Sequence, residues 1–161
     1  MKKEPCQSLD EFFDQYGDMV FRVALQHSQN DADAQDITQE VFIKIWKGHP
    51  PFYTSDHEKA WILRIALNAC HDRWRFIKRA KLVALDESLV AGKQEHKYYL
   101  LNTVKHLPMK YRTVIYLFYY EEMSVKEIAI FLGKNENTIL TWLSRARQRL
   151  KKELGEDDEK R

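Results

Sequence analysis

The segment from Ser124 to Leu150 decides the fold of the C-terminal part of the chain, and it reads SVKEIAIFLGKNENTILTWLSRARQRL. Ser124, followed three residues later by Glu127, is a capping box that begins a short helix. Gly133 permits a sharp turn, because a residue without Cβ adopts positive φ at low cost. Asn135 can cap a second helix through its side-chain oxygen. The segment therefore predicts a helix-turn-helix, a motif whose second helix enters the DNA major groove.

The predicted second helix has a buried stripe and a polar outer face. Helical spacing places on one side the apolar residues Ile139, Leu143, Ala146 and Leu150. The outer side carries Asn137, Thr141, Ser144, Arg145 and Gln148. Arg147 and Arg149 lie on opposite flanks, which suits phosphate contacts on both sides of a groove. The alternative is a plain αα-hairpin with a solvated basic face, but the capped helix, the glycine turn and the arginine-rich helix together favour DNA binding.

Helical patterns also cover the N-terminal half. Ser8 and Glu11 form another capping box, followed by an apolar set of Phe12, Phe13, Tyr16, Val20, Val23 and Ala24. A second helix is predicted to begin between Asp31 and Asp33, to bury Ala34, Ile37, Val41 and Ile45, and to end at the GHPP sequence of residues 48–51, since prolines cannot continue a helix. We expect a loop over residues 52–57 and a long helix from about Glu58 to Arg79.

The chain of 161 residues is predicted to be all-α, with two small helical domains joined by a flexible linker. The first domain is expected over residues 8–79. Residues 80–96 weaken the helical pattern and are expected to form the linker. The second domain, residues 97–154, is expected to contain a helix from Tyr99 to Leu107, a buried helix from Tyr111 to Tyr120, and the helix-turn-helix.

Composition and the N-terminal sequence exclude several protein classes. No stretch approaches the roughly 20 uncharged apolar residues of a membrane span, and the N-terminal sequence lacks the apolar run of a signal peptide. Cys6 and Cys70 lie far apart and form no metal or redox motif. We therefore expect a cytoplasmic protein with no metal and no cofactor.

The net charge of +2 hides a strong asymmetry. Residues 1–60 contain 6 basic and 11 acidic side chains, a net charge of 6 − 11 = −5, whereas residues 61–85 contain 6 and 1, a net charge of 6 − 1 = +5. Residues 133–161 contain 8 basic and 6 acidic side chains, including an acidic tail. An acidic part followed by two basic patches indicates one protein partner and two contacts to a polyanion, although solvated surfaces alone can also carry such blocks.

The acidic part contains a candidate docking face. On the helix of residues 33–47, the face opposite the core stripe carries Asp36, Gln39, Glu40 and Ile43. Acids, an amide and an aliphatic side chain together are typical of a protein-docking surface. The alternative is an ordinary solvated face.

The first basic patch has the chemistry of single-strand capture, in which cations follow the backbone and rings or amides hold unstacked bases. The long helix supplies Arg64, Asn68, His71, Arg73, Trp74 and Arg75, and the preceding loop supplies Phe52 and Tyr53. The alternative is that the tryptophans Trp61 and Trp74 are core residues. We expect this for Trp61, which lies within the apolar stripe.

Three motifs in order resemble the extracytoplasmic-function (ECF) sigma factors, the smallest class of the sigma-70 family. AQDITQEVFIKIW, at residues 34–46, resembles the region that docks on the clamp helices of the largest polymerase subunit. WILRIALNACHDRWR, at residues 61–75, resembles the segment that melts and holds the −10 promoter element. Leu107-Pro108, followed by the helix-turn-helix ending in LSRAR at residues 143–147, resembles the domain that reads the −35 element.

The resemblance implies a sigma factor that binds core RNA polymerase, recognises a promoter and promotes DNA melting without doing chemistry itself. Core-binding residues are then Asp36, Gln39, Glu40 and Ile43. In this family the loop matching residues 51–58 and the asparagine matching Asn68 capture a flipped base, so −10 contacts are expected from Phe52, Tyr53, Arg64, Asn68, His71, Arg73, Trp74 and Arg75. The −35 contacts are expected from Lys134, Asn135, Asn137, Thr138, Thr141, Ser144, Arg145, Arg147 and Arg149. An anti-sigma factor, often membrane-anchored in relatives, is an expected partner.

The sequence departs from the family at three positions of the recognition helix, and at one of them Asn137 stands where a small residue, often glycine, is frequent. Leu140 and Trp142 are apolar where a cation is frequent, so the promoter preference of relatives does not transfer to this chain. Two other classes of protein fit the residues less well. A helix-turn-helix regulator with a ligand-sensing or dimerising N-terminal half gives no reason for the cluster from Asn68 to Arg75. A nucleic-acid enzyme needs paired carboxylates or a metal site near the basic patch, yet Asp72 is the only acid in residues 61–85.

Overall fold

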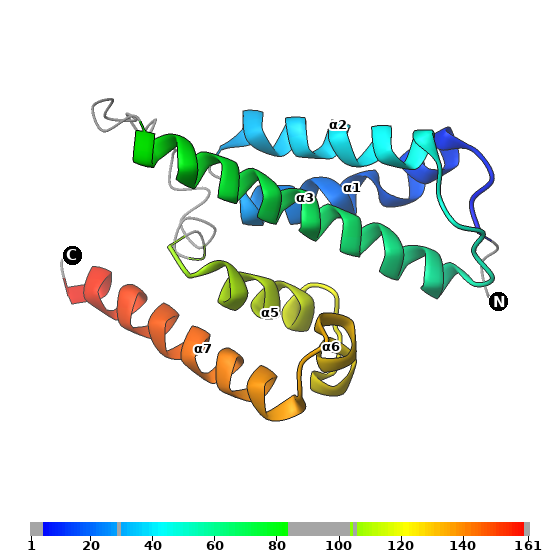
Figure 1. The fold of residues 1–161 in the computed structure, drawn as a ribbon. Coiled ribbons are helices and arrows are strands. Elements are labelled where there is room, and N and C mark those ends of the chain that lie inside the picture. Colours follow the sequence, from blue (N-terminus) through cyan, green and yellow to red (C-terminus); the bar gives the residue numbers. More distant parts are fainter. Residues whose placement is uncertain (1–4, 29, 84–103, 105, 160–161) are drawn as a thin grey trace. The chain divides into compact units, whose positions relative to one another are not determined.

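The computed structural model describes residues 5–28, 30–83, 104 and 106–159, and the structure in these ranges is helical (Figure 1). The helices are α1 (Leu9–His27), α2 (Asp31–Lys47), α3 (Ser55–Val83), α5 (Met109–Tyr119), α6 (Val125–Leu132) and α7 (Glu136–Glu159). The chain divides into two compact units, residues 1–88 and 89–161. The all-α class with a C-terminal helix-turn-helix is thereby confirmed. None of the described helices combines the length and apolar character needed to cross a membrane.

The N-terminal unit is a bundle in which α1, α2 and α3 each pack against the other two. Each helix contributes a stripe of small and branched side chains at helical spacing. Each residue of these stripes is at most 1% exposed. The stripes are Val20, Val23 and Ala24 in α1; Ala34, Ile37 and Val41 in α2; and Ile62, Ala66 and Cys70 in α3. Phe13, which the sequence groups with Phe12 in one apolar set, is 58% exposed, whereas Phe12 is 1% exposed. Consecutive residues point about 100° apart on a helix, so Phe13 lies beyond the edge of the stripe that buries Phe12.

Side-chain caps set where the N-terminal helices begin. Ser8 accepts a hydrogen bond from the backbone N–H of Glu11, as the sequence predicted. Asn30, for which no cap was predicted, accepts one from the backbone N–H of Asp33. The expected loop over residues 52–57 is too long, because α3 begins at Ser55. The hydroxyl of Thr54 accepts a hydrogen bond from the N–H of His57, and the acids Asp56 and Glu58 in the first turn favour the positive end of the helix dipole.

The end of α3 lies at Val83 rather than near Arg79. Residues 84–96 of the expected linker lie outside the described residues. Most of the helix expected over residues 99–107 also lies outside them, although Val104 and Leu107 are described and buried. The buried helix expected over residues 111–120 is confirmed as α5, which starts two residues earlier.

In the C-terminal unit, α5, α6 and α7 pack against one another. Both hydrogen bonds of the Ser124–Glu127 capping box are present. Gly133 ends α6 with φ +66°, the left-handed conformation that glycine adopts without steric cost. Asn135 then caps α7, accepting a 2.7 Å hydrogen bond from the N–H of Thr138. The helix-turn-helix predicted from these residues is thus confirmed.

Candidate docking and nucleic-acid interfaces

The predicted docking residues lie together on the solvent side of α2. Asp36 and Glu40 expose 61% and 50% of their side chains, and Gln39 and Ile43 are also exposed. Glu40 lies 3.5 Å from Lys44 in an i,i+4 ion pair. Exposed pairs of this kind contribute less than about 1 kcal/mol, so the carboxylate of Glu40 is available to a stronger partner.

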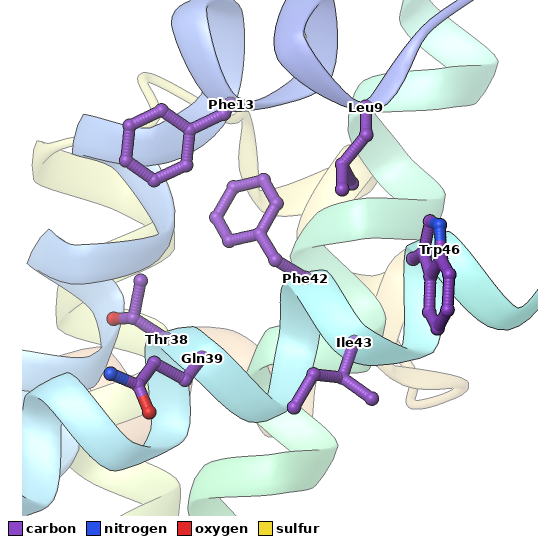
Figure 2. A pocket seen from close by; sticks show the side chains of 7 residues that line it. All are labelled: Leu9, Phe13, Thr38, Gln39, Phe42, Ile43 and Trp46. Carbon is purple, nitrogen blue, oxygen red and sulfur yellow. The ribbon is translucent and has the colours of Figure 1, made fainter.

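An apolar groove borders this face, between the start of α1 and the second half of α2 (Figure 2). The groove encloses about 360 Å³ and is lined by Leu9, Phe13, Thr38, Gln39, Phe42, Ile43 and Trp46. The rings of Phe13 and Phe42 lie 5.2 Å apart along it, and Trp46 is 72% exposed. Clustered exposed aromatic and aliphatic side chains mark a surface for a partner.

Five groove residues were not predicted to belong to this face: Thr38 and the apolar Leu9, Phe13, Phe42 and Trp46. The signal of the apolar residues is present in the sequence, because Leu9 and Phe13, and likewise Phe42 and Trp46, are apolar pairs at i,i+4 spacing. The sequence does not show that the two pairs belong to helices whose exposed edges meet.

The cationic face of α3 brings together four of the predicted strand-binding residues. Arg64, Asn68, His71 and Arg75 recur at positions i, i+4, i+7 and i+11, which places them on one side of a helix. Arg64, Asn68 and Arg75 are exposed. Arg75 makes a 3.9 Å contact with Asp72, in which both side chains are about two-thirds exposed. This face therefore presents cations and an amide to solvent.

His71 is the half-buried member of this face. Burial, together with the nearby Arg75 guanidinium, lowers the pKa of His71 below its ordinary value. Its Nε2 atom is buried without a hydrogen-bond partner among the described residues. The imidazole is therefore neutral at physiological pH and supports the face as a hydrogen-bonding group rather than as a cation.

Arg73 is separated from this face. Its Nη2 atom lies 2.7 Å from the carboxylate of Asp33 and 3.6 Å from that of Asp36, so it links α3 to α2. At nine residues from Arg64, Arg73 points about 180° away from it on a helix. Trp74 is half-buried, and the ammonium of Lys78 lies 4.9 Å from its ring. The structure thus brings Arg73 together with the docking residue Asp36 and not with Asn68.

The loop between α2 and α3 presents its two aromatic residues differently. Phe52 is half-buried, and its ring lies 5.5 Å from that of Trp61. Tyr53 is 84% exposed. Trp61, assigned to the core, is half-buried and belongs to this ring cluster rather than to the fully buried stripe.

The outer face of α7 carries neutral polar groups and one cation. Asn137, Thr141, Ser144 and Arg145 are exposed, as is Lys134 in the turn before the helix. The Asn135 side chain is occupied by the helix cap, and the hydroxyl of Thr138 donates a further 2.8 Å hydrogen bond to it. The hydroxyl of Thr141 donates to the carbonyl oxygen of Asn137 within the helix.

Two arginines of α7 contact α5. The Nε of Arg147 donates a 2.8 Å hydrogen bond to the hydroxyl of Tyr119, and its guanidinium carbon lies 5.4 Å from the Phe118 ring and 5.6 Å from the Tyr119 ring. The guanidinium of Arg149 lies 5.2 Å from the ring of Tyr111. Arg145 has no such contact among the described residues. The three arginines therefore do not form a single set of solvent-facing cations.

Leu140 and Trp142, the two apolar residues of α7 that depart from the family pattern, differ in their exposure to solvent. Leu140 is 52% exposed. Trp142 is half-buried, with the ammonium of Lys110 lying 5.5 Å from its ring. Only Leu140 is therefore placed for an apolar contact outside the unit, such as with a thymine methyl group.

Comparison with known proteins assigns each unit to a family region. Residues 12–80 match the family model for sigma-70 region 2, and residues 97–150 match that for sigma-70 region 4. The chain is 31% identical over 144 residues to the RNA polymerase sigma factor SigV of Bacillus subtilis, with 86% of each chain covered. It is 30% identical over 155 residues to the ECF RNA polymerase sigma factor SigM of the same species, covering 89% of this chain and 93% of that one.

A solved structure has the same fold. The sigma factor RpoE from Bartonella quintana, crystallised in complex with the anti-sigma factor NepR, superposes with a TM-score of 0.74 at 20% identity. The superposition covers 91% of this chain and 96% of that one.

Proposed function

The chain belongs to the ECF class of the sigma-70 family of RNA polymerase sigma factors, and from that membership we propose how its separate surfaces divide the work of transcription initiation. A sigma factor of this class binds core RNA polymerase and promoter DNA. The observation that carries the proposal is a chemical contrast within the N-terminal unit: α1 and α2 expose acids and apolar rings, whereas α3 exposes cations and an amide.

The face of α2 and the adjoining groove are proposed to dock on core polymerase. Asp36, Gln39, Glu40 and Ile43 form the polar and aliphatic part of this surface, and Phe13 and Trp46 extend it. Interfaces combine a buried apolar centre with a polar rim, and aromatic side chains contribute most of their energy. The groove supplies such a centre, bordered by two carboxylates.

The exposed face of α3 and the α2–α3 loop are proposed to hold the −10 element as a single strand. Removing a base from the duplex stack costs a few kcal/mol, which stacking and hydrogen bonds must recover. Asn68 and Tyr53 supply an amide and a ring for that base, while Arg64 and Arg75 follow the backbone, and neutral His71 and half-buried Phe52 and Trp74 support them. Arg73 does not belong to this surface, because it is paired with Asp33 and Asp36.

The outer face of α7 is proposed to read the −35 duplex. Asn137, Thr141 and Ser144 present hydrogen-bonding groups to base edges, and Lys134 and Arg145 contact phosphates. Asn135 and Thr138 set the start of the helix, and Arg147 and Arg149 hold it against α5. We further infer that two domains, residues 8–79 and 97–154, are joined by a linker over residues 80–96, the first residues of which, up to Val83, continue α3, so that each domain can follow its own promoter element.

We infer that the factor acts in the cytoplasm, without catalysing a reaction, and is controlled by an anti-sigma factor. RpoE of B. quintana is bound by one in its crystal structure. Purification of the tagged chain from its native cell under mild conditions is expected to recover a stoichiometric inhibitor, and addition of that protein should abolish transcription. Recovery of fully active factor at all growth stages would contradict this control.

Two asparagine variants test the division between the DNA surfaces. The chain is mixed with bacterial core polymerase and a promoter selected by that holoenzyme from a randomised DNA library. Asn68→Ala is expected to slow promoter opening while leaving binding to the duplex unchanged. Asn137→Ala, a matched change of an exposed amide on α7, is expected to weaken duplex binding. Transcription that does not depend on the added chain, or equal effects of both variants on both steps, would refute the proposal.

A further inference from the structure

The loop between α2 and α3 is held by a cluster of rings, here called the aromatic anchor: Phe12, His49, Phe52 and Trp61. The imidazole of His49 stacks on the ring of Phe52, with centroids 5.1 Å apart and planes inclined by 8°. Phe12 meets the His49 ring edge-on at 5.0 Å, and Trp61 lies 6.3 Å from it. These distances and tilts fall in the range in which ring pairs attract each other.

Both sides of the anchor are rigid. Phe12 is 1% exposed and belongs to the core of the bundle. On the other side, the fully buried Glu58 in the first turn of α3 accepts a 2.7 Å hydrogen bond from the hydroxyl of Tyr16 and another from the N–H of Cys6. Burial and the bond to Glu58 raise the pKa of Tyr16, which therefore stays a donor. The loop thus ends at a fixed helix start.

His49 is exposed to solvent, and a hydrogen bond orients its ring. Its Nδ1 lies 2.9 Å from the carbonyl oxygen of Pro50, so this nitrogen carries the proton and donates the hydrogen bond. Pro50 and Pro51 restrict the backbone φ angles that follow. Removal of the imidazole would therefore free Phe52 from a ring that covers its face, while the backbone on either side kept its restrictions.

Tyr53, next to the anchored Phe52, is in the opposite situation. It is 84% exposed, and within the described part of the chain its ring stacks on no other. Because Phe52 is packed into the anchor, the backbone position of Tyr53 is set before a base binds, and its free ring face can serve as a stacking platform. The orientation of this platform depends on the residue that holds Phe52 in place.

We propose that His49 is a positioning residue for promoter opening: by clamping Phe52 into the aromatic anchor, it holds Tyr53 outward as the platform on which an unstacked promoter base stacks. This inference rests on the proposed −10 function of the loop. It assigns His49 no contact with DNA, and it distinguishes Tyr53, which touches the base, from Phe52, which does not.

Four single variants and one double variant test the proposal in the holoenzyme. The probe is a promoter selected by the wild-type holoenzyme, used as a duplex and as a premelted heteroduplex, with open complex formation read by permanganate reactivity of −10 thymines. Removal of one base–aromatic stack lowers such binding about 5- to 100-fold, so Tyr53→Ala is expected to lower open complex formation by about 10-fold. His49→Ala and His49→Leu are expected to lower it by about 5-fold, whereas His49→Phe, which keeps a flat ring, stays near wild type.

The double variant carries the decisive comparison. If His49 acts through Tyr53, His49→Leu combined with Tyr53→Ala is no worse than Tyr53→Ala alone, because interacting residues are not additive. Multiplication of the two effects would overturn the positioning role while leaving the −10 function intact. A His49→Phe variant that opens the promoter as poorly as His49→Leu would also overturn the positioning role, because it would show that the imidazole nitrogens are needed rather than the flat ring. No effect of Tyr53→Ala would instead refute the proposed stacking function of the loop. Core binding is expected to stay unchanged in the leucine variant, and a drop in it would also overturn the proposal.

Discussion

Replacement of Arg147 by alanine separates a structural arginine from a DNA-binding one on the same helix. In the structure the Arg147 guanidinium donates to the Tyr119 hydroxyl at 2.8 Å and lies over two rings of α5. Its neighbour Arg145, two residues earlier, is exposed on the outer face. We expect Arg147→Ala to destabilise the packing of α7 on α5 and Arg145→Ala to weaken DNA binding.

The expected loss of stability in Arg147→Ala follows from the interactions that Arg147 makes with α5. A hydrogen bond contributes about 0.5–1.5 kcal/mol net, and each cation–π interaction at an exposed site about 0.5–1 kcal/mol. Because Arg147 is itself exposed and both rings compete for one guanidinium, we expect the alanine variant to destabilise the C-terminal unit by about 1–2 kcal/mol. Arg145→Ala should change its stability by less than about 0.5 kcal/mol.

Two measurements on the full-length chain distinguish these roles. Amide hydrogen exchange along α5 and α7 reports the local free energy of opening. The dependence of holoenzyme–promoter affinity on salt reports how many phosphates the protein neutralises, and its logarithmic slope changes by about 0.9 for each phosphate. We expect Arg147→Ala to accelerate exchange and to leave the slope intact, and Arg145→Ala to do the reverse. A slope that falls as far in Arg147→Ala as in Arg145→Ala would refute the assignment of Arg147 to helix packing.

Three further outcomes are expected. Ile43→Glu, in the groove of α1 and α2, should weaken core polymerase binding by about 10-fold in a fluorescence titration, a decrease of roughly 1.4 kcal/mol in binding free energy. The control is Ile130→Glu, which changes an exposed isoleucine of α6. An equal loss of affinity in the control would show that the groove is not part of the interface. Gly133→Ala should destabilise the C-terminal unit by about 1–2 kcal/mol because the φ of Gly133 is +66°. Gly155→Ala, inside α7 with open space around the added Cβ, should stabilise the unit by about 0.5–1 kcal/mol. Hydrogen exchange measures both changes, and a stability change of the same sign in the two variants would contradict the turn geometry. Burial raises the pKa of Cys70 to about 12, whereas the thiol of the unfolded chain ionises near pH 8.5. The contribution of the buried thiol to folding stability is therefore complete below about pH 8.5 and declines as the pH rises toward 12. Alkylation of Cys70 at about pH 9 that is as fast in the folded chain as in the denatured chain would contradict this burial.

The helices, the caps of α1, α6 and α7, and the family were predictable from the sequence. The capping box of Ser124 and Glu127, the glycine turn at Gly133 and the cap at Asn135 all act within four residues, so their geometry follows from local rules. The buried stripes recur every three or four residues, and the motifs of both sigma regions are contiguous. The acidic residues on α2 and the cations on α3 were predictable for the same reason, because one helix alone puts them on one face.

Which of these side chains face a partner and which hold the fold together follows from the packing of the helices and not from the sequence pattern. Arg73 pairs with Asp33, 40 residues away, and Arg147 with Tyr119, 28 residues away; no local pattern distinguishes them from Arg75 or Arg145. The groove of Phe13, Phe42 and Trp46 exists only because α1 and α2 meet along their exposed edges, and the stack of His49 on Phe52 only because the loop folds back on Phe12. Such interactions depend on how helices pack, which is set by the whole core at once, whereas caps and stripes depend on a single turn of chain.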